Sequence, residues 1–442
     1  MRRVAGLLVL VFALGITRTD GQTIPTSPGN AGSKPVGRPL SIQEAEATAI
    51  RQNPDITIGQ LRALEAKEFV RETRSAYFPT ANLSLTGVGA NAGSRIAAGY
   101  LNNPVIYPRA AAGVSVNQLI TDFGRTKNLL SSSEFQSKAE DENAVATQQQ
   151  IILAVDEAFY NSLEARALLA VAQETVNARQ TLVDQVQALT NAKLKSDLDL
   201  SFSKVDLARA KLLLLDSQSN YEAAITSLSA ILGYPERQEF EPVEPADQEG
   251  PPSEDPAPLI QQALQQRPEV LGLRNQVTAA EKFGKAEHDL WRPTVGALGV
   301  VGLAPVRDDH IENWYGAAGV NINIPIFNGF LFNARAKSAD LQTDLQRKQL
   351  EGLQNNVARD VRNGWLDTRK AYERMGVTKQ FQDQANLALQ LAQSRYKLGL
   401  GSIVEFSQAE LQKTDADLQN TDAHYQYLLS QILLAYEMGT TR

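Results

Sequence analysis

Cysteine is absent from the 442-residue chain, and histidine occurs only three times. The lack of thiols excludes disulfides, thiolate metal sites, cysteine nucleophiles and a lipid-modified N-terminal cysteine. Because His288, His310 and His424 are scattered, we expect no histidine metal cluster. No nucleophile elbow, phosphate-binding loop or metal-ligand spacing occurs, and a net charge of −7 argues against a nucleic-acid partner. We therefore expect no enzyme activity and no cofactor.

Long apolar runs are scarce as well. Arg2 and Arg3, followed by the apolar run Val4–Ile16, are typical of a secretory signal, so residues 1–22 are predicted to be a cleaved signal peptide. A single anchoring helix is the alternative, although the run is short for a membrane span. Residues 23–39, rich in Pro, Gly and Ser, are predicted to be a disordered lead-in. No other stretch approaches about 18 apolar residues, so only a closed β-barrel could embed the mature chain in a membrane.

Glycine and proline are missing from unusually long segments. Neither occurs in residues 125–232, and proline does not occur in 326–442. Because both residues interrupt helices, their absence predicts very long ones, at about 125–191, 198–232, 330–398 and 404–437. The first would reach roughly 100 Å at 1.5 Å per residue. A helix of that length needs neighbours along all of it, as in a coiled coil or a helical barrel.

The sequence is also a duplication. Asn53-Pro54-Asp55-Ile56 returns 214 residues later as Arg267-Pro268-Glu269-Val270, and Ala111–Val114 returns 206 residues later as Ala317–Val320. Each half has the order helix, two strands, very long helix, short turn, long helix. Between the halves lies a segment with seven prolines and eight acidic residues, which is predicted to be a linker. The predicted boundaries are 40–234 for the first repeat, 235–258 for the linker and 259–438 for the second repeat.

Four segments change to a period of two and are predicted to be strands. In Val114-Ser115-Val116-Asn117, for example, apolar and polar residues alternate, which indicates a sheet with one polar face. Alternation alone fits both a soluble sandwich and a porin-like wall. Four strands cannot close a barrel, whereas twelve strands from three chains could. The predicted strands cover about 81–90, 110–119, 294–303 and 315–324.

Aromatic residues bracket these strands, with Tyr77, Phe78 and Trp291 before them and Tyr100, Tyr107, Trp314 and Tyr315 toward the other ends. That placement suits the aromatic girdles of membrane interfaces, although aromatic residues near strand ends are common in soluble sheets too.

Four motifs in order resemble the TolC family of outer-membrane factors. Leu40–Ala45 with Asn53-Pro54-Asp55 resembles the opening signature of that family. Gln118–Arg125 and Ile324–Gly329 resemble its two strand-to-helix junctions, and Tyr396–Glu405 is similar to its second hairpin tip. The resemblance extends over about 40–436, which is nearly all of the mature chain.

The resemblance implies a mainly α fold with a small β part. Three chains would form one 12-stranded transmembrane β-barrel, continued by a long α-helical barrel in the periplasm. The protein would be the exit duct of a tripartite efflux pump or type I secretion system in the outer membrane. Its partners would be a periplasmic adaptor protein, an inner-membrane pump or ABC transporter, outer-membrane lipid and two further copies of itself. A periplasmic coiled-coil scaffold or adaptor without a pore is the alternative, but it leaves the duplicated strands without a purpose.

The resemblance also implies roles at the hairpin tips. Tyr396 matches a tyrosine that is linked to an aspartate, matched by Asp199, and Glu405 matches an acid of the aperture ring. The chain departs from the family at Gly401, where some members have an arginine, and at Gln408, which replaces a second ring acid. The tip residues expected to contact the adaptor are Leu194, Lys195, Ser196, Gly399, Leu400 and Ser402.

Each tip residue also has a purely structural interpretation. Gly399 and Gly401 are simple candidates for helix C-caps, and Ser196 or Asp197, together with Ser402, for N-caps. The carboxylates of Asp199 and Glu405 lie early in the following helices, where they interact favourably with the helix dipole. The structural and gating interpretations are compatible.

Overall fold

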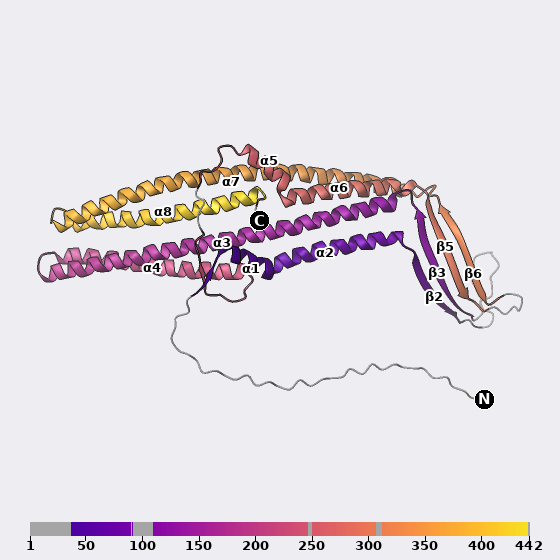
Figure 1. The fold of residues 1–442 in the computed structure, drawn as a ribbon, viewed down its shortest axis with the longest axis horizontal. Coiled ribbons are helices and arrows are strands. Elements are labelled where there is room, and N and C mark those ends of the chain that lie inside the picture. The colour runs from indigo at the N-terminus through magenta and orange to yellow at the C-terminus, as the bar shows by residue number, and fades with distance from the viewer. Residues whose placement is uncertain (1–36, 90, 92–108, 246–249, 306–311, 441–442) are drawn as a thin grey trace, which may run out of the picture. The chain divides into compact units, whose positions relative to one another are not determined.

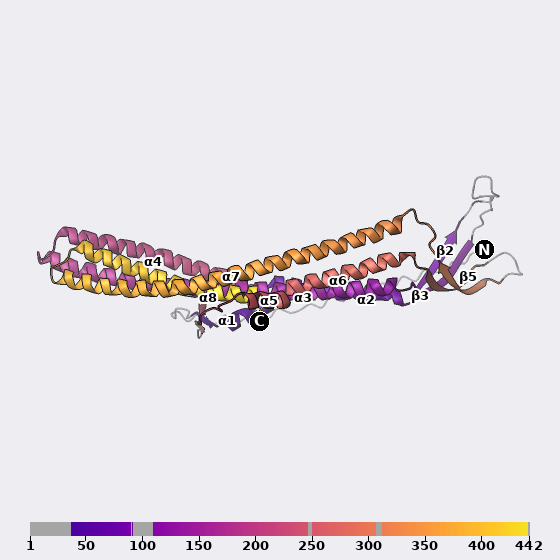
Figure 2. The same cartoon turned by 90° about the horizontal axis from the view of Figure 1, so that it is seen from above.

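The computed structural model describes residues 37–89, 91, 109–245, 250–305 and 312–440. The predicted signal peptide, nearly all of the lead-in, and Tyr100 and Tyr107 lie outside these ranges. Within residues 38–442 the chain is mainly helical with a small β part, which confirms the predicted class of fold. Figures 1 and 2 both place the large sheet at one end of the helices and two helical hairpin turns at the other.

The two repeats contain the same elements in the same order. The first comprises α1 (Ile42–Gln52), α2 (Pro54–Arg74), a 3-10 turn (Ser75–Tyr77), β2 (Thr80–Val88), β3 (Arg109–Thr121), α3 (Arg125–Asn191) and α4 (Asp197–Ile231). The second comprises α5 (Ala257–Gln266), α6 (Pro268–His288), a 3-10 turn (Asp289–Trp291), β5 (Thr294–Leu303), β6 (Trp314–Asn323), α7 (Leu331–Lys397) and α8 (Ile403–Glu437).

The longest helices, α3 and α7, have 67 residues each. Each folds back onto a 35-residue partner, giving the hairpins α3–α4 and α7–α8, and α3 also packs against α2, α6 and α8. α7 continues unbroken through three glycines, and one of them, Gly364, lies against Leu434 of α8. Among the described residues, no helix combines the length and the apolar character needed to cross a membrane.

The ends of the lead-in and the linker differ from their prediction, because both contain ordered structure. β1 (Arg38–Leu40) overlaps the predicted disordered lead-in at Arg38 and Pro39, and it pairs in parallel with β4 (Phe240–Pro242), which lies in the predicted linker. Leu40 and Phe240 are buried in an apolar core with α1, α3 and α4, and that burial holds the short strands in place. The linker is also bound to the second hairpin, since the Trp365 indole donates to the Ser253 carbonyl at 2.7 Å. Its last residues already belong to α5.

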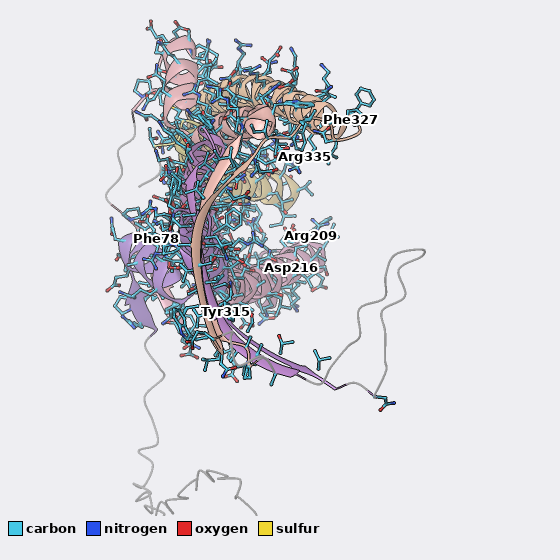
Figure 3. The ribbon with its side chains drawn as sticks, turned by 90° about the vertical axis from the view of Figure 1, so that its right-hand side faces the viewer. Phe78, Arg209, Asp216, Tyr315, Phe327 and Arg335 are labelled. Carbon is cyan, nitrogen blue, oxygen red and sulfur yellow. The ribbon has the colours of Figure 1, made fainter. Side chains whose placement is uncertain are left out.

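The large sheet is antiparallel, with the strand order β2-β3-β5-β6. Seen from the strand end it is strongly curved (Figure 3). Gly113 of β3 and Gly302 of β5 are paired, and the ring of Tyr315 lies so close to both that a Cβ on either would collide with it. Among the described residues, the outer edges of β2 and β6 have no strand partner.

The strand-to-helix junctions turn through two consecutive residues of left-handed backbone in each repeat. They are Phe123 and Gly124 before α3, and Gly329 and Phe330 before α7. These pairs are 206 residues apart, with the glycine second in one and first in the other. The Asp122 carboxylate accepts from the backbone N–H groups of Gly124 (3.2 Å) and Thr126 (2.6 Å), so it caps the first turn of α3.

The second junction also exposes apolar side chains. Phe327 stands clear of the ribbon in Figure 3 and is 73% exposed, and Ile326 is 89% exposed. Next to this junction, the Arg335 guanidinium binds the buried carboxylate of Glu287 through two hydrogen bonds of 2.6 and 2.9 Å.

Candidate functional site at the hairpin tips

The hairpin turns are built by equivalent residues of the two repeats. Lys193 (φ +61°) and Gly399 (φ +71°) both adopt left-handed backbone just after their helices, and they are 206 residues apart. Glycine adopts this conformation without strain, whereas lysine does so at a cost. Ser402 is the N-cap of α8, as predicted, and of the two candidates for the N-cap of α4 it is Ser196, not Asp197.

Tyr396 lies at the centre of the tip and is only 6% exposed. Its ring stacks on Phe406 of α8 with a centroid distance of 5.5 Å, and the Lys195 ammonium lies 3.9 Å from its centroid on the other hairpin. The surrounding apolar cluster joins α3, α7 and α8, so the ring connects the two hairpins. The other buried members of this cluster are Leu182, Val186, Ala392, Ile403 and Ala409.

The Tyr396 hydroxyl is buried and has no hydrogen-bond partner among the described atoms of the chain. Burial, and secondly the negative charge of Asp199, raise the pKa of this phenol. Asp199 itself accepts a 3.2 Å hydrogen bond from the Ser196 N–H in a capping box. The structure thus brings Tyr396 and Asp199 near each other without a hydrogen bond between them, and the link from phenol to carboxylate stays a prediction for the assembled protein.

Glu405 has a partner that sequence reasoning missed. Its carboxylate lies 3.1 Å from the Arg395 guanidinium, which also donates to the Leu400 carbonyl at 3.3 Å. Arg395 precedes Tyr396, so an arginine is present at this tip although Gly401 occupies the position where some family members have one. Both side chains are about half exposed (56% and 45%), so salt and water screen their attraction.

The tips are apolar on the outside as well. Leu194, Leu198, Leu398 and Leu400 are each at least 64% exposed, two on each hairpin. Beside them, a groove of about 420 Å³ lies between α3 and α7. Exposed apolar side chains clustered beside a groove are typical of a surface that contacts another protein. The groove is lined on both sides by residues such as Thr181, Gln185, Leu189, Gln393 and Lys397.

A second feature that the sequence did not reveal is a buried polar layer farther from the tips. Arg179 of α3 forms an ion pair with Glu410 of α8, and the Ser407 hydroxyl of α8 donates to Asp206 of α4. Burial lowers the pKa of Arg179, and the negative charge of Asp206 partly opposes that shift. The residues of each pair are more than 200 positions apart in the chain, so no local sequence pattern could have indicated the contact.

The long paired hairpins, the duplicated strands and the two capped tips define a class of protein, the outer-membrane efflux duct. A family model described as outer membrane efflux protein matches residues 47–234 and 259–440, so the chain belongs to this family. The family predicted from the sequence motifs is thereby confirmed.

Individual relatives agree over nearly the whole chain. Outer membrane protein TolC of Escherichia coli (strain K12) is 22% identical over 429 residues, covering 93% of this chain and 84% of TolC. Cation efflux system protein CusC of the same strain is 22% identical over 425 residues, covering 93% of this chain and 89% of CusC. The structure of outer membrane protein VceC from Vibrio cholerae has a TM-score of 0.77 at 17% identity, covering 90% of this chain and 96% of VceC. This last likeness shows the fold.

Proposed function

We propose that the chain is one protomer of an outer-membrane channel, the passive exit duct of a tripartite efflux pump or type I secretion system. Its cargo would be small molecules or polypeptides, and a periplasmic adaptor and an inner-membrane pump or ABC transporter would be its partners. One observation carries the proposal: an open-edged sheet with exposed apolar side chains continues directly into helices of roughly 100 Å. A scaffold without a pore has no use for such a sheet.

The sheet supports a trimeric barrel because the repeat relation preserves strand register. Thr80 of β2 pairs with Asn117 of β3. Adding 214 and 206 residues, respectively, gives Thr294 and Asn323, which are partners in β5 and β6. The pairs β2–β3 and β5–β6 are therefore superimposable in register, and the pairing of β3 with β5 can serve as a template for that of β6 with β2 of another copy.

Applying the same shifts to β3–β5 predicts the contacts between copies. Within one chain, Ser115 of β3 pairs with Val300 of β5. The repeat equivalent of Ser115 is Asn321, and that of Val300 is Thr86. Asn321 of one copy should therefore lie opposite Thr86 of the next. By the same rule Ile322 lies opposite Leu85. The exposed apolar side chains, Leu85 at 75% and Ile322 at 59%, then share one face, while Asn321 and Thr86 share the other. Apolar pairs toward lipid and polar pairs toward a lumen are what a membrane barrel requires.

Cysteine cross-linking tests this register in a chain that has no cysteine of its own. The double substitution Asn321→Cys with Thr86→Cys is expected to give covalently linked trimers on mild oxidation, because directly opposed residues lie within disulfide reach. Asn321→Cys with Asn82→Cys is the control, since Asn82 is on the same face but roughly 13 Å farther along the strand. Non-reducing gel electrophoresis reads the result. Monomers alone, or equal cross-linking in the control, would contradict the proposed trimer.

At the other end, we propose that Tyr396, Asp199 and Glu405 form the gate and aperture of the periplasmic entrance, while the leucine-rich tips contact the adaptor. The buried ring of Tyr396 joins the two hairpins, and Asp199 caps the start of α4 beside it. The proposal is further supported by the exposed leucines and by the position of Glu405 at the start of α8.

Charge reversal at Glu405 is expected to change ion selectivity. Three carboxylates, one from each copy, favour cations in a narrow mouth. Glu405→Lys should shift the reversal potential in planar-bilayer recordings toward anion selectivity. The reversal potential of Glu405→Gln should lie between those of the parent and Glu405→Lys. Asp383→Lys, at an exposed position of α7, is the control, because it changes the net charge by the same amount and sign. If the Glu405 variants and the parent give the same reversal potential, Glu405 does not line the entrance.

A further inference from the structure

A groove of about 780 Å³ lies on the helices that connect the large sheet to the middle of the chain. Its walls come from α2, α3, α6 and α7, which lie side by side in this order (Figure 1). α2 and α7 are the two ends of the row, and Figure 2 shows α7 rising out of the layer of the other three. Because the groove touches all four helices, it lies on the concave side of a curved row.

The walls of the groove are built by equivalent residues of the two repeats. Phe69 of α2 and Phe283 of α6 are 214 residues apart, which is the repeat spacing in this region. Their rings are 51% and 40% exposed. The Oε1 atom of Gln346 is buried and has no hydrogen-bond partner among the described residues. Amide side chains from three of the four helices line the groove beside the rings, namely Gln136, Gln276, Gln342 and Gln346.

The other side of the same helices has a different chemistry. Lys67 of α2 pairs with Asp141 of α3 at 2.8 Å, and Glu281 of α6 pairs with Arg347 of α7 at 2.7 Å. Lys67 and Glu281 are each two positions before a phenylalanine of the groove, which is roughly 200° around the helix. The convex side is therefore covered by ion pairs between neighbouring helices, whereas the concave side exposes aromatic rings and amides.

Three charged residues also line the groove, Arg62, Glu65 and Glu140. With one positive and two negative charges, its net charge is −1 per chain. Among the described residues none of the three forms an ion pair, so their charges are not neutralised by a fixed partner. The groove thus combines aromatic surface with a small excess of negative charge.

We propose that this groove is a binding site for planar aromatic cations inside the duct. The inference rests on the proposed channel function and names a class of cargo for it. When three copies surround an axis, the concave side of each row of helices becomes the wall of the lumen. Phe69 and Phe283 of the three copies then form a belt of six rings around the path of the cargo.

The chemistry of the groove fits this class of molecule. Aromatic faces attract cations and stack with planar rings, and the negative net charge disfavours anions. The volume of the groove is in the range of small-molecule sites. Since the rings stay about half exposed, binding is weak, and a conduit requires sites that release what they bind.

Cysteine substitution tests whether the groove faces the lumen, in a chain that has no cysteine of its own. During planar-bilayer recording of full-length Phe69→Cys, a cationic methanethiosulfonate reagent should cause a stepwise loss of current. Lys67→Cys is the matched control, because Lys67 is exposed on the opposite side of the same helix. It should be modified, as mass spectrometry would show, without a change in current.

Binding of ethidium, a planar aromatic cation, tests the chemistry of the groove by fluorescence anisotropy with the detergent-solubilised protein. Phe69→Leu with Phe283→Leu keeps apolar side chains but removes the aromatic faces, so the dissociation constant should rise roughly tenfold. Phe202→Leu is the control, since Phe202 of α4 is 40% exposed and lies outside the groove. The anionic dye fluorescein should bind the parent more weakly than ethidium does.

The two measurements separate failure of this inference from failure of the proposed function. If the parent forms no channels, the proposed function fails, and ethidium binding still decides whether the groove is a site. If the parent conducts and modified Phe69→Cys passes the same current as before, the groove does not face the lumen and the inference is overturned. Equal affinity of the parent and the double leucine variant for ethidium would overturn it too.

Discussion

Asp156→Asn is expected to raise the thermal midpoint of the protein strongly at about pH 9 and hardly at all at about pH 4. Asp156 of α3 is only 6% exposed, and its Oδ1 atom has no hydrogen-bond partner among the described residues. Burial, reinforced by Glu46 of α1 through charge and a hydrogen bond, and then by Glu157, raises the pKa of Asp156 to about 8. An asparagine has nearly the same shape and carries no charge.

The direction of this pH dependence follows from the linkage between proton binding and folding. Because the pKa of Asp156 is higher in the folded state than in the unfolded chain, the folded state binds the extra proton between about pH 4 and pH 8. The free energy of unfolding therefore decreases through that window as pH rises, by at most about 1.4 kcal/mol per pH unit from this group. The pKa of Glu164 is raised to about 7 by burial and by Asp422, so a weaker slope of the same sign should persist in the variant.

Differential scanning calorimetry in detergent at both pH values measures this effect. Asp184→Asn is the matched control, because Asp184 is on the same helix but exposed. An equal change of midpoint at both pH values would show that Asp156 is already charged in the folded protein.

Tyr396→Ala is expected to open the periplasmic entrance, and Tyr396→Phe, which removes only the hydroxyl, should open it much less. Alanine removes the stacking on Phe406 and the contact with the Lys195 ammonium, and it leaves a cavity between the hairpins. Truncation of a buried aromatic ring costs about 3–5 kcal/mol. Phenylalanine keeps the ring and removes only a buried hydroxyl that has no partner within the chain, so its cost is small.

The contrast between these two variants tests what Tyr396 contributes to the gate. Conductance in bilayers and entry of large antibiotics into cells are the measurements, with trimer content as the control for assembly. If Tyr396→Phe opens the channel as much as Tyr396→Ala, the hydroxyl forms its bond to Asp199 only in the trimer. In that case Tyr396→Phe with Asp199→Ala should open it no further than either change alone.

Prediction from sequence was strongest where the signal is local. The absence of glycine and proline between 125 and 232 is a property of neighbouring residues, and it accounts for the length of α3. Ser196 and Ser402 were recognisable as N-caps for the same reason. By contrast, composition alone predicted a linker and gave no sign of β4, because β4 is ordered only by its pairing with β1 and by a core formed with distant helices.

The ion pairs in and near the hairpin tips show the same difference between local contacts and long-range contacts. Arg395 and Glu405 are ten residues apart across a short turn, so their ion pair could have been predicted from the sequence by considering the geometry of the turn. Arg179 and Glu410 are separated by most of the second repeat, and only the packing of α8 against α3 brings them together.

What the sequence by itself determined is the family, the duplicated frame and the mainly helical fold, since periodicity, capping and internal repeats depend on residues close along the chain or on fixed spacings. Only the tertiary structure decided the strand order, the partner of Glu405, the unpaired hydroxyl of Tyr396 and the burial of the ionisable side chains of Asp156 and Arg179. The physical reason is that desolvation and ion pairing depend on which surfaces meet in space, and distant parts of the chain supply those surfaces.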